Sequence, residues 1–563
     1  MKGWFSDLSR RQVSLFLLGG WTVLNLWQAW QSELLHDEAY YWFFSLHPAW
    51  GYAEHAPMIS WMIWLGRHLL GGEIGVRLLT VLMSTGTLWL VFQCTDRQQP
   101  RLFWMIALSM IIVHFGGFIA APDSPLIFFT ALYLYLFKRY LEAETLLNTL
   151  LLGLAVVGLV YSKYHGLMVL FFCLLGHPVL LKKGSFWALA IGCTLLYLPH
   201  LSFLYGENFG TFTYHLVDRI ATPWEPHFFY DFFLNQLLIA GPFIGFWIFI
   251  AVWKIKPADP FERCLKFIIW GVLGFLFLLS FQTHIEANWA ATAYLPILIL
   301  TYRYMKDWEK GQLWLRRLLI PSLVIIGVFR LYLVVDFLPF VATIRNEFHQ
   351  YDTWAEEVAE IAGDRPVVFH NSYTYPSKYR FYAGKEGHGF NDMNYRRTQY
   401  DLLPIEESLQ GKEVVYMRAG QLDWADTLHA AVGRDFLYRI VPNFRSYNRL
   451  MLEITSEVPD KMPAGDSLAV EMKLVNGYET PVDLLANPQL GLTRAVYWTQ
   501  RGSFSQLQFS HKFITPRILT DTMNLDWKIA MPTTPGTYEF IVTLRQEWVS
   551  PGIKARQYQI EIE

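Results

Sequence analysis

Two polar clusters in one early segment of the chain carry the residue types that acid–base chemistry requires. HDEAYYW contains the adjacent acids Asp37 and Glu38, and WGYAEHAPM contains Glu54 and His55. Ionisable side chains beside apolar runs are costly at membrane depth unless they are paired or hydrated, so they indicate function by default. One such carboxylate can take a proton from an acceptor hydroxyl, while a second acid orients the acceptor or a sugar.

Three further clusters add cations and amides to the same chemistry. AAPDSP contributes Asp123, YSKYHG contributes Lys163 and His165, and the weaker cluster QTHIEANW contributes His284 with other polar side chains. Cationic groups can neutralise the phosphate that leaves when a sugar is transferred from a lipid phosphate. The same carboxylates could in principle hydrolyse glycosides instead.

Each cluster also has a purely structural explanation when it is considered alone. Asp37 and Glu38 could be ordinary interfacial acids, and Asp123 could cap the helix that follows it. Lys163 could extend to the lipid head groups, and His165 could be a packed histidine. Because the topology derived below brings all the clusters to one face, we interpret them together as one site.

The elements that must position these clusters are predicted to be membrane-spanning helices. The chain has 563 residues, of which 53% are hydrophobic and 17% charged, whereas soluble proteins carry about 25% charge. Apolar runs that approach the bilayer-spanning length of about 20 residues predict about eleven spans, or up to about thirteen. The segment 31–73 is predicted to be the first outer loop. Its second half, SWMIWLGRHLLG, is predicted to form an amphipathic helix at the membrane interface.

The distribution of basic residues between alternate loops predicts the orientation. Pairs such as Lys138 with Arg139 and Lys182 with Lys183 fall in loops assigned to the inside, whereas the outer loops hold few basic residues. With an odd number of spans, the polar clusters and everything after the last span lie outside. The predicted location is the inner (cytoplasmic) membrane, as a multi-pass protein with an extracytoplasmic C-terminal region.

The composition changes to that of a soluble protein after the last apolar run. We expect a membrane-embedded domain at 1–340, an α/β region at 341–450 and an immunoglobulin-like β-sandwich at 451–563, where SLAVEMKLVN alternates in the manner of a strand. The net charge of −2 gives no sign of nucleic-acid binding. The four cysteines lie in or beside apolar runs, so neither a disulfide framework nor a zinc-ligand spacing is present.

Five motifs, taken in order, resemble the C-type glycosyltransferases. The nearest resemblance is to the bacterial branch that includes dolichyl-phosphate-mannose-protein mannosyltransferase-like enzymes and aminoarabinose lipid A transferases. The motifs are HDEAYYW, WGYAEHAPM, APDSPLIFFTALYLY, SKYHGLMVL and NWAATAYLPI. The resemblance covers about residues 1–340 and is specific as a combination, although each motif alone is weak.

The resemblance implies that Asp37 is the general base of the first outer loop and that Glu54 is a second catalytic acid. The residues predicted to contact substrate are Glu38, Tyr41, His55, Asp123, Lys163, Tyr164, His165, Arg219, His284, Asn288 and Trp289. Among them Lys163, together with Arg219, is assigned to the phosphate of the donor. The chain departs from the family at Ala56-Pro57, where two prolines are common, and at His55, where a basic residue usually precedes them.

The predicted function is inverting transfer of a hexose or pentose from a polyprenyl-phosphate donor to an envelope lipid, glycan or protein acceptor. Nucleotide sugars are absent outside the membrane, which favours a lipid-linked donor, and no Walker or Rossmann glycine pattern is present. No cofactor is assigned. A divalent cation could be held by Asp37, Glu38, Glu54 and His284, although their spacing matches no known metal signature.

Two non-enzymatic alternatives remain open at this point. A lipid or polysaccharide transporter would be expected to carry charges at mid-membrane and symmetry between two halves of the chain. This sequence keeps its acids at loop level and has no internal repeat. An envelope assembly protein would use the C-terminal sandwich to bind a partner, which leaves Asp37, Glu54 and Asp123 unexplained.

Overall fold

The chain forms two compact units, Met1–His349 and Gln350–Glu563, in a computed structural model. The structure describes residues 9–207, 209–210, 224–338, 347–391, 395–420, 426–485, 492–500, 503–509, 518–545 and 557–563. Each unit has its own hydrophobic cores.

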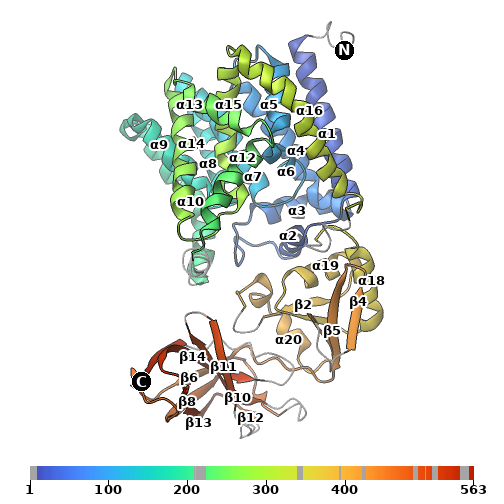
Figure 1. Ribbon diagram of the computed structural model, residues 1–563, viewed down its shortest axis with the longest axis vertical. Coiled ribbons are helices and arrows are strands. Elements are labelled where there is room, and N and C mark those ends of the chain that lie inside the picture. The colour runs from blue at the N-terminus through green and yellow to red at the C-terminus, as the bar shows by residue number, and fades with distance from the viewer. Residues whose placement is uncertain are drawn as a thin grey trace. The chain divides into compact units, whose positions relative to one another are not determined.

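The first unit is a bundle of helices (Figure 1). Its α-helices are α1 (Arg10–Gln31), α2 (His36–Leu46), α3 (Met58–Leu69), α4 (Gly72–Gln93), α5 (Pro100–Ser109), α6 (Ile111–Phe115), α7 (Asp123–Glu142), α8 (Leu146–Ser162), α9 (Gly166–Gly176), α10 (Gly184–Gly206), α12 (His227–Ala240), α13 (Gly245–Lys254), α14 (Pro260–Leu279), α15 (Ala291–Met305) and α16 (Glu309–Tyr332). Two 3₁₀ turns, η1 (Pro178–Lys182) and η3 (Ala287–Ala290), connect them. Local signals set several of the starts: Ser9 forms a capping box before α1, and Asp259 caps α14, whose first residue is Pro260.

Three of the described helices are long and apolar enough to cross a membrane by length and composition, namely α4, α10 and α16. The pair α12 and α13 passes the same test together, but it is bent by 92° at the break between the two helices. The predicted fold class, a helical membrane protein with a strand-rich C-terminal region, is confirmed. The number of spans, about eleven to thirteen, stays a prediction.

Two helix breaks meet inside this bundle. A single residue separates the end of α5 at Ser109 from the start of α6 at Ile111, and α12 ends at Ala240, just before Gly241, whose φ of 147° is strained for any residue with a side chain. A Cβ on Gly241 would lie 2.8 Å from the carbonyl oxygen of Ser109, so only glycine allows the two breaks to approach this closely. Irregular backbone at membrane depth is tolerated where protein surrounds it, as it does here.

The segment between α1 and α4 contains two short helices, α2 and α3, at one end of the bundle (Figure 1). The stretch predicted to be an amphipathic helix corresponds to α3, whose buried residues include Ile59, Met62 and Ile63. Trp64 and Leu65 on the same helix are exposed. α2 carries the first polar cluster, so the structure places the two acids of HDEAYYW in the first turn of a helix.

The second unit begins with a five-stranded mixed sheet in the order β2-β1-β3-β5-β4. Its strands are β1 (Val367–His370), β2 (Gly387–Phe390), β3 (Val414–Ala419), β4 (Asp426–Ala430) and β5 (Arg434–Val441). β1 pairs in parallel with β2 and β3, whereas β5 is antiparallel to both of its neighbours. The helices of this region are α18 (Tyr351–Ala362), α19 (Thr374–Ala383), η4 (Gln399–Asp401) and α20 (Ile405–Leu409), and Trp354 of α18 is fully buried in the shared core.

The remainder of the second unit consists of strands. One sheet has the order β11-β10-β14-β15-β7 and the other has the order β13-β8-β6, with a short β12-β9 pair beside them. The strands are β6 (Leu450–Ile454), β7 (Lys461–Met462), β8 (Ser467–Asn476), β9 (Val482–Asp483), β10 (Thr493–Gln500), β11 (Ser503–Phe509), β12 (Ile518–Leu519), β13 (Thr522–Ala530), β14 (Gly536–Arg545) and β15 (Gln557–Ile562). Alternate residues of both sheets, such as Val470 and Met472 from one and Trp498 and Phe540 from the other, share one core, as the two sheets of a sandwich do.

Candidate active site

A buried ion pair fixes the start of α2. Arg77 of α4 donates from Nε to Glu38 Oε1 at 2.8 Å and from Nη2 to Glu38 Oε2 at 2.5 Å, and each side chain is 1% exposed. The remaining guanidinium hydrogens reach the backbone at the end of α1, including Ser32 O at 2.6 Å and Glu33 O at 2.7 Å. A two-point contact of this kind fixes both distance and orientation. Glu38 and Arg77 therefore hold α1, α2 and α4 together.

Asp37 and Glu38 are neighbours in the sequence but have different environments. Asp37 is exposed in the first turn of α2, whereas Glu38 is buried. Successive residues on a helix point about 100° apart, so a helix that buries one acid turns the other outward. In this conformation both oxygens of Glu38 are occupied by Arg77 and by the backbone N–H groups of Leu35 and Ala120. Asp37 is the acid of the pair that solvent can reach.

Tyr40 and Tyr41, three and four positions after Asp37, form hydrogen bonds with residues of the second cluster. Tyr40 donates its hydroxyl to Glu54, at 3.1 Å from Oε2 and 3.3 Å from Oε1. Tyr41 lies 3.3 Å from Nε2 of His55 through its hydroxyl. Positions i, i+3 and i+4 share one face of a helix. The face of α2 that carries Asp37 is thus also the face that binds the WGYAEHAPM segment.

The third and fourth clusters meet in an ion pair. Lys163 Nζ, between α8 and α9, lies 2.9 Å and 3.0 Å from the two oxygens of Asp123 at the start of α7. Asn288 of η3 donates to Asp123 Oδ2 at 2.8 Å. Beside them, the rings of His165 and Trp289 meet edge to face with centroids 5.6 Å apart. The side chains of Lys163 and Asp123 are 12% and 14% exposed, so the pair is accessible without being on the open surface.

A series of hydrogen bonds joins the first loop to these two clusters. Ala120 N, three residues before Asp123, donates to Glu38 Oε1 at 2.8 Å. His200 of α10 lies with Nε2 3.1 Å from the Tyr164 hydroxyl and with Nδ1 2.6 Å from the carbonyl oxygen of Trp50. The links Glu38–Ala120, Asp123–Lys163, Tyr164–His200 and His200–Trp50 together form what we call the contact ring. It connects α2, α7, the α8–α9 loop, α10 and the α2–α3 loop.

The remaining predicted site residues lie beside the contact ring or outside the described part of the chain. The ring of His284 lies between two acids, with Nε2 4.0 Å from Asp231 and Nδ1 4.0 Å from Glu286, and all three side chains are well exposed. Arg219 lies outside the described residues. Among the residues that the structure describes, no group of three His, Cys, Asp or Glu side chains has the arrangement of a metal site.

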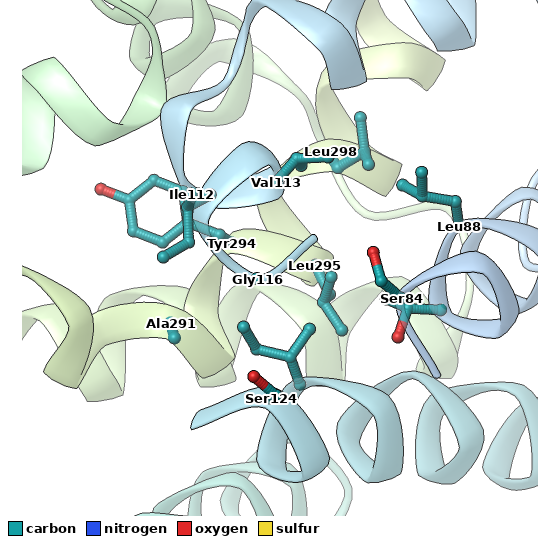
Figure 2. A pocket seen from close by; sticks show the side chains of 12 residues that line it. Ser84, Leu88, Ile112, Val113, Gly116, Ser124, Ala291, Tyr294, Leu295 and Leu298 are labelled. Atoms are coloured by element: carbon teal, nitrogen blue, oxygen red, sulfur yellow. The ribbon is translucent and has the colours of Figure 1, made fainter. Parts of the chain in front are cut away.

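A small cavity lies next to Asp123, between α4, α6, α7 and α15 (Figure 2). Its volume is about 30 Å³, and its lining is mostly aliphatic with hydroxyls from Ser84, Thr87 and Ser124. Figure 2 shows the Tyr294 hydroxyl directed away from Ser84, and this group donates to Gln236 O at 2.8 Å. A space of this size holds about one water molecule. The cavity is therefore too small for a sugar ring.

Sequence reasoning missed two residues that organise this site. Arg77, one of the few basic residues that fall in the predicted outer loops, lies within α4 and is buried. His200 lies in an apolar run and is fully buried, with both ring nitrogens in hydrogen bonds. A lone ionisable residue inside an apolar run was the available signal for each of them.

The arrangement supplies the parts that transfer of a group from a phosphate requires. An exposed carboxylate, Asp37, can accept a proton, and a second carboxylate, Glu54, is held by a phenol nearby. An ammonium group, Lys163, is available to a phosphate from the side that Asp123 does not occupy. Nothing in this set of groups requires a nucleotide or a redox cofactor.

Comparisons with known proteins bear on the family and the fold of this chain. Residues 54–203 match the family model described as dolichyl-phosphate-mannose-protein mannosyltransferase. The lipid A galacturonosyltransferase RgtD of Rhizobium johnstonii is 27% identical over 329 residues, which cover 54% of this chain and 68% of that protein. These matches confirm the resemblance to C-type glycosyltransferases that the motifs predicted.

The fold is also similar to that of a solved membrane protein. The crystal structure of ArnT from Cupriavidus metallidurans in the apo state superposes with a TM-score of 0.56 at 12% identity, covering 76% of this chain and 98% of that one. A second crystal structure of the same protein, bound to undecaprenyl phosphate, gives a TM-score of 0.56 at 13% identity, covering 75% and 97% of the two chains. At this level of identity the likeness concerns the fold.

Proposed function

We propose that this chain, a membrane glycosyltransferase by its similarities, transfers a sugar from a polyprenyl-phosphate donor to a lipid A-type acceptor with Asp37 as the general base. The acceptor class is suggested by the similarity to RgtD, whose name gives lipid A as its substrate. The donor class is suggested by the ArnT fold, which has been solved with undecaprenyl phosphate bound. Both similarities favour an enzyme over a transporter or an assembly protein.

The observation that carries this proposal is the contact ring. Polar groups that lie far apart in the sequence, from Glu38 to Asn288, are connected by these hydrogen bonds. Isolated interfacial acids or snorkelling lysines would have no reason to be joined in this way. Preorganised charges at fixed positions are the main means by which enzymes stabilise a transition state.

The two acids of α2, Asp37 and Glu38, have different roles in this proposal. Asp37 takes the proton from the acceptor hydroxyl as the new glycosidic bond forms and the bond to the donor phosphate breaks. Glu38, held by Arg77, keeps α2 in place, and this proposal gives it that supporting role in place of the substrate contact predicted from the sequence. Glu54, which Tyr40 holds, orients the acceptor or the sugar.

The ion pair of Lys163 with Asp123 serves the leaving phosphate. Asp123 and Asn288 hold the Lys163 segment in place, and the ammonium group of Lys163 neutralises charge that develops on the departing polyprenyl phosphate. His165, Tyr164 and Trp289 line the same region and complete the donor side. Arg219, which sequence reasoning assigns to the same phosphate, is expected to assist Lys163.

We place this site on the extracytoplasmic side of the inner membrane, because basic residues concentrate in the opposite set of loops. The C-terminal unit would then also be extracytoplasmic. A reporter enzyme fused after Glu563 should be active only outside the cytoplasm. Activity inside would place the contact ring on the wrong side for a lipid-linked donor.

The direct test of the function is a transfer assay with the purified, reconstituted protein. Lipid A, an undecaprenyl-phosphate hexose or pentose and the protein should yield lipid A heavier by one sugar residue, detected by mass spectrometry. A nucleotide sugar should give no product. Release of free sugar without any acceptor product would instead identify a hydrolase and overturn the proposal. Comparison of envelope lipids from cells with and without the gene would identify the natural sugar.

A further inference from the structure

Trp50 is a half-exposed indole on a segment that is held unusually firmly. The residue is 52% exposed, although it lies in the loop between α2 and α3 beside the contact ring. Exposed tryptophans are common in membrane proteins, where they sit at the lipid interface. Trp50 differs from such residues in what fixes its backbone.

Three consecutive residues of this loop are each held by a different partner. Trp61 Nε1 donates to Ala49 O at 3.0 Å, and His200 Nδ1 lies 2.6 Å from Trp50 O. Gly51 packs so closely on α10 that a Cβ would lie 2.2 Å from the ring of Phe203. The loop thus cannot shift at Ala49, Trp50 or Gly51 without losing a contact.

The side chain of Trp50 is also supported from one side. Its ring lies edge to face with Trp61, with centroids 5.3 Å apart, and 6.3 Å from the ring of Tyr161. Trp61 and Tyr161 are themselves in contact at 5.3 Å. Aromatic neighbours in these geometries restrict a ring without covering all of it. The part of the indole that stays exposed is therefore presented in a fixed orientation.

His200 links the backbone of Trp50 to the part of the proposed site that contacts the donor phosphate. His200 joins Trp50 to Tyr164, the neighbour of Lys163. The Lys163–Asp123 pair is only 12% to 14% exposed, whereas Trp50 is 52% exposed. A sugar that is attached directly to the donor phosphate belongs at the more enclosed position. The more open indole suits a second ring that arrives from the membrane surface.

We infer that Trp50 is a platform on which a pyranose ring of the glycolipid acceptor stacks, with His200 as the residue that positions it. This inference rests on the proposed function. The C–H groups on one face of a pyranose carry partial positive charge, and the face of an indole is negative, so the two attract. A flat, rigid surface loses little conformational freedom on binding, which raises affinity without a new charge.

The test measures equilibrium binding of four probes to the reconstituted full-length protein in nanodiscs, without turnover. Lipid A is compared with phosphatidic acid, which has acyl chains and phosphate but no sugar. Undecaprenyl-phosphate hexose is compared with undecaprenyl phosphate. Trp50→Ala should weaken lipid A binding by about 5- to 10-fold and leave the other three probes unchanged, while Trp50→Phe retains most of the affinity.

Two further variants separate a sugar platform from a membrane anchor and from a general packing defect. Trp64→Ala removes another exposed indole, 42% exposed on α3, and should change no probe. His200→Ala should reproduce the loss for lipid A, and the double variant with Trp50→Ala should lose no more than Trp50→Ala alone. An additive loss in the double variant would remove His200 from the platform.

Three results would overturn the inference. They are an equal loss for phosphatidic acid, a loss for the undecaprenyl-phosphate hexose in place of lipid A, and the same effect from Trp64→Ala. If the wild-type protein transfers sugar and the Trp50→Ala variant still binds lipid A normally, the platform is refuted and the proposed function stands. Binding of lipid A through Trp50 by a protein that transfers no sugar would refute the proposed function alone.

Discussion

The unit Met1–His349 and the unit Gln350–Glu563 use charged side chains differently. In the first unit Glu38 and Arg77 are 1% exposed and join three helices. In the second unit the pairs Arg365–Glu413, Arg449–Glu407 and Lys461–Glu561 have side chains that are 37% to 56% exposed. Exposed pairs of this kind contribute little to stability, and buried ones require exact geometry.

From the buried pair Glu38–Arg77 we expect the chemistry to lie in the first unit. A protein accepts the cost of desolvating charges where those charges perform or support a reaction. The second unit buries the charged side chain of Lys378 against the ring of Tyr351, and its partly buried carboxyl, Glu406, accepts hydrogen bonds from the neutral hydroxyls of Tyr478 and Ser446. We therefore expect substitutions of charged residues to abolish activity in the first unit and to have modest effects on stability in the second.

The strongest test of this contrast is Asp37→Asn. The amide keeps the shape of the side chain but cannot accept a proton, so the turnover rate should fall by about 10²- to 10⁴-fold while donor binding remains. Product formation by mass spectrometry and binding of undecaprenyl phosphate measure the two quantities. Glu73→Gln, in the first turn of α4, is a matched control that should leave the rate within about twofold. Full activity of well-folded Asp37→Asn protein would mean that the base lies elsewhere.

Arg77→Met tests whether the buried pair is a structural support. Removing one partner strands Glu38 as an uncompensated buried charge, so the protein should lose about 3–5 kcal/mol of stability. Thermal unfolding in detergent measures the loss. Lys183→Met breaks the more exposed pair with Glu144 and should cost about 1 kcal/mol or less. Equal effects of the two substitutions would remove the distinction between buried and exposed pairs.

Lys163→Ala tests the donor side. Loss of a charge-assisted contact to the leaving phosphate should weaken transition-state stabilisation by about 2–4 kcal/mol. The kcat/KM for the lipid-phosphate donor should fall accordingly while the unfolding temperature changes little. A variant that folds normally and uses the donor at the wild-type rate would remove Lys163 from the site.

The smallest predicted effect concerns Glu406 in the C-terminal unit. Burial raises the pKa of this carboxyl from 4.5 to about 7, against the hydrogen bond from Tyr478, which lowers it. Because the folded form binds the proton more tightly than the unfolded chain, this stabilising contribution is complete below about pH 4.5 and is lost as the pH rises through 7. Glu406→Gln should flatten the dependence of the unfolding temperature between pH 5 and 8 by a few degrees, equivalent to about 1–2 kcal/mol.

The control for this experiment is Glu407→Gln, which removes the adjacent exposed acid that pairs with Arg449. Calorimetry of the full-length protein should give this variant the same pH dependence as the wild type. If Glu406→Gln also retained the wild-type pH dependence, the carboxyl would titrate normally and the second unit would contain no strongly perturbed acid of this kind.

The sequence predicted the helices well and their connections poorly. Long apolar runs of the sequence correspond to helices such as α4, α8 and α10, because the length of an apolar run is a local property. The motifs also indicated Asp37, Glu54, Asp123 and Lys163 as members of one group. In the structure the partly buried Asp123 forms an ion pair with Lys163.

The roles of Glu38 and Arg77 could not be predicted in the same way. Their contact joins positions that are 39 residues apart, and no local pattern reports which acid of the pair Asp37–Glu38 a helix will bury. His200 is a similar case, since its two partners, Trp50 and Tyr164, are 150 and 36 residues away. Side-chain pairing across helices depends on packing, which a single sequence does not encode locally.

The contact ring has a consequence for how the protein is made. Glu38 forms hydrogen bonds with Arg77 and with the backbone of Ala120, both of which come later in the chain. His200 on α10, later still, completes the contact ring through its hydrogen bond with the carbonyl oxygen of Trp50. A chain that is synthesised and inserted from its N-terminus therefore holds the first loop with unmatched acids until α4 enters the membrane. The loop gains its final shape only when α10 has been inserted. We expect a nascent chain that is arrested before His200 to lack the complete contact ring and therefore to be inactive.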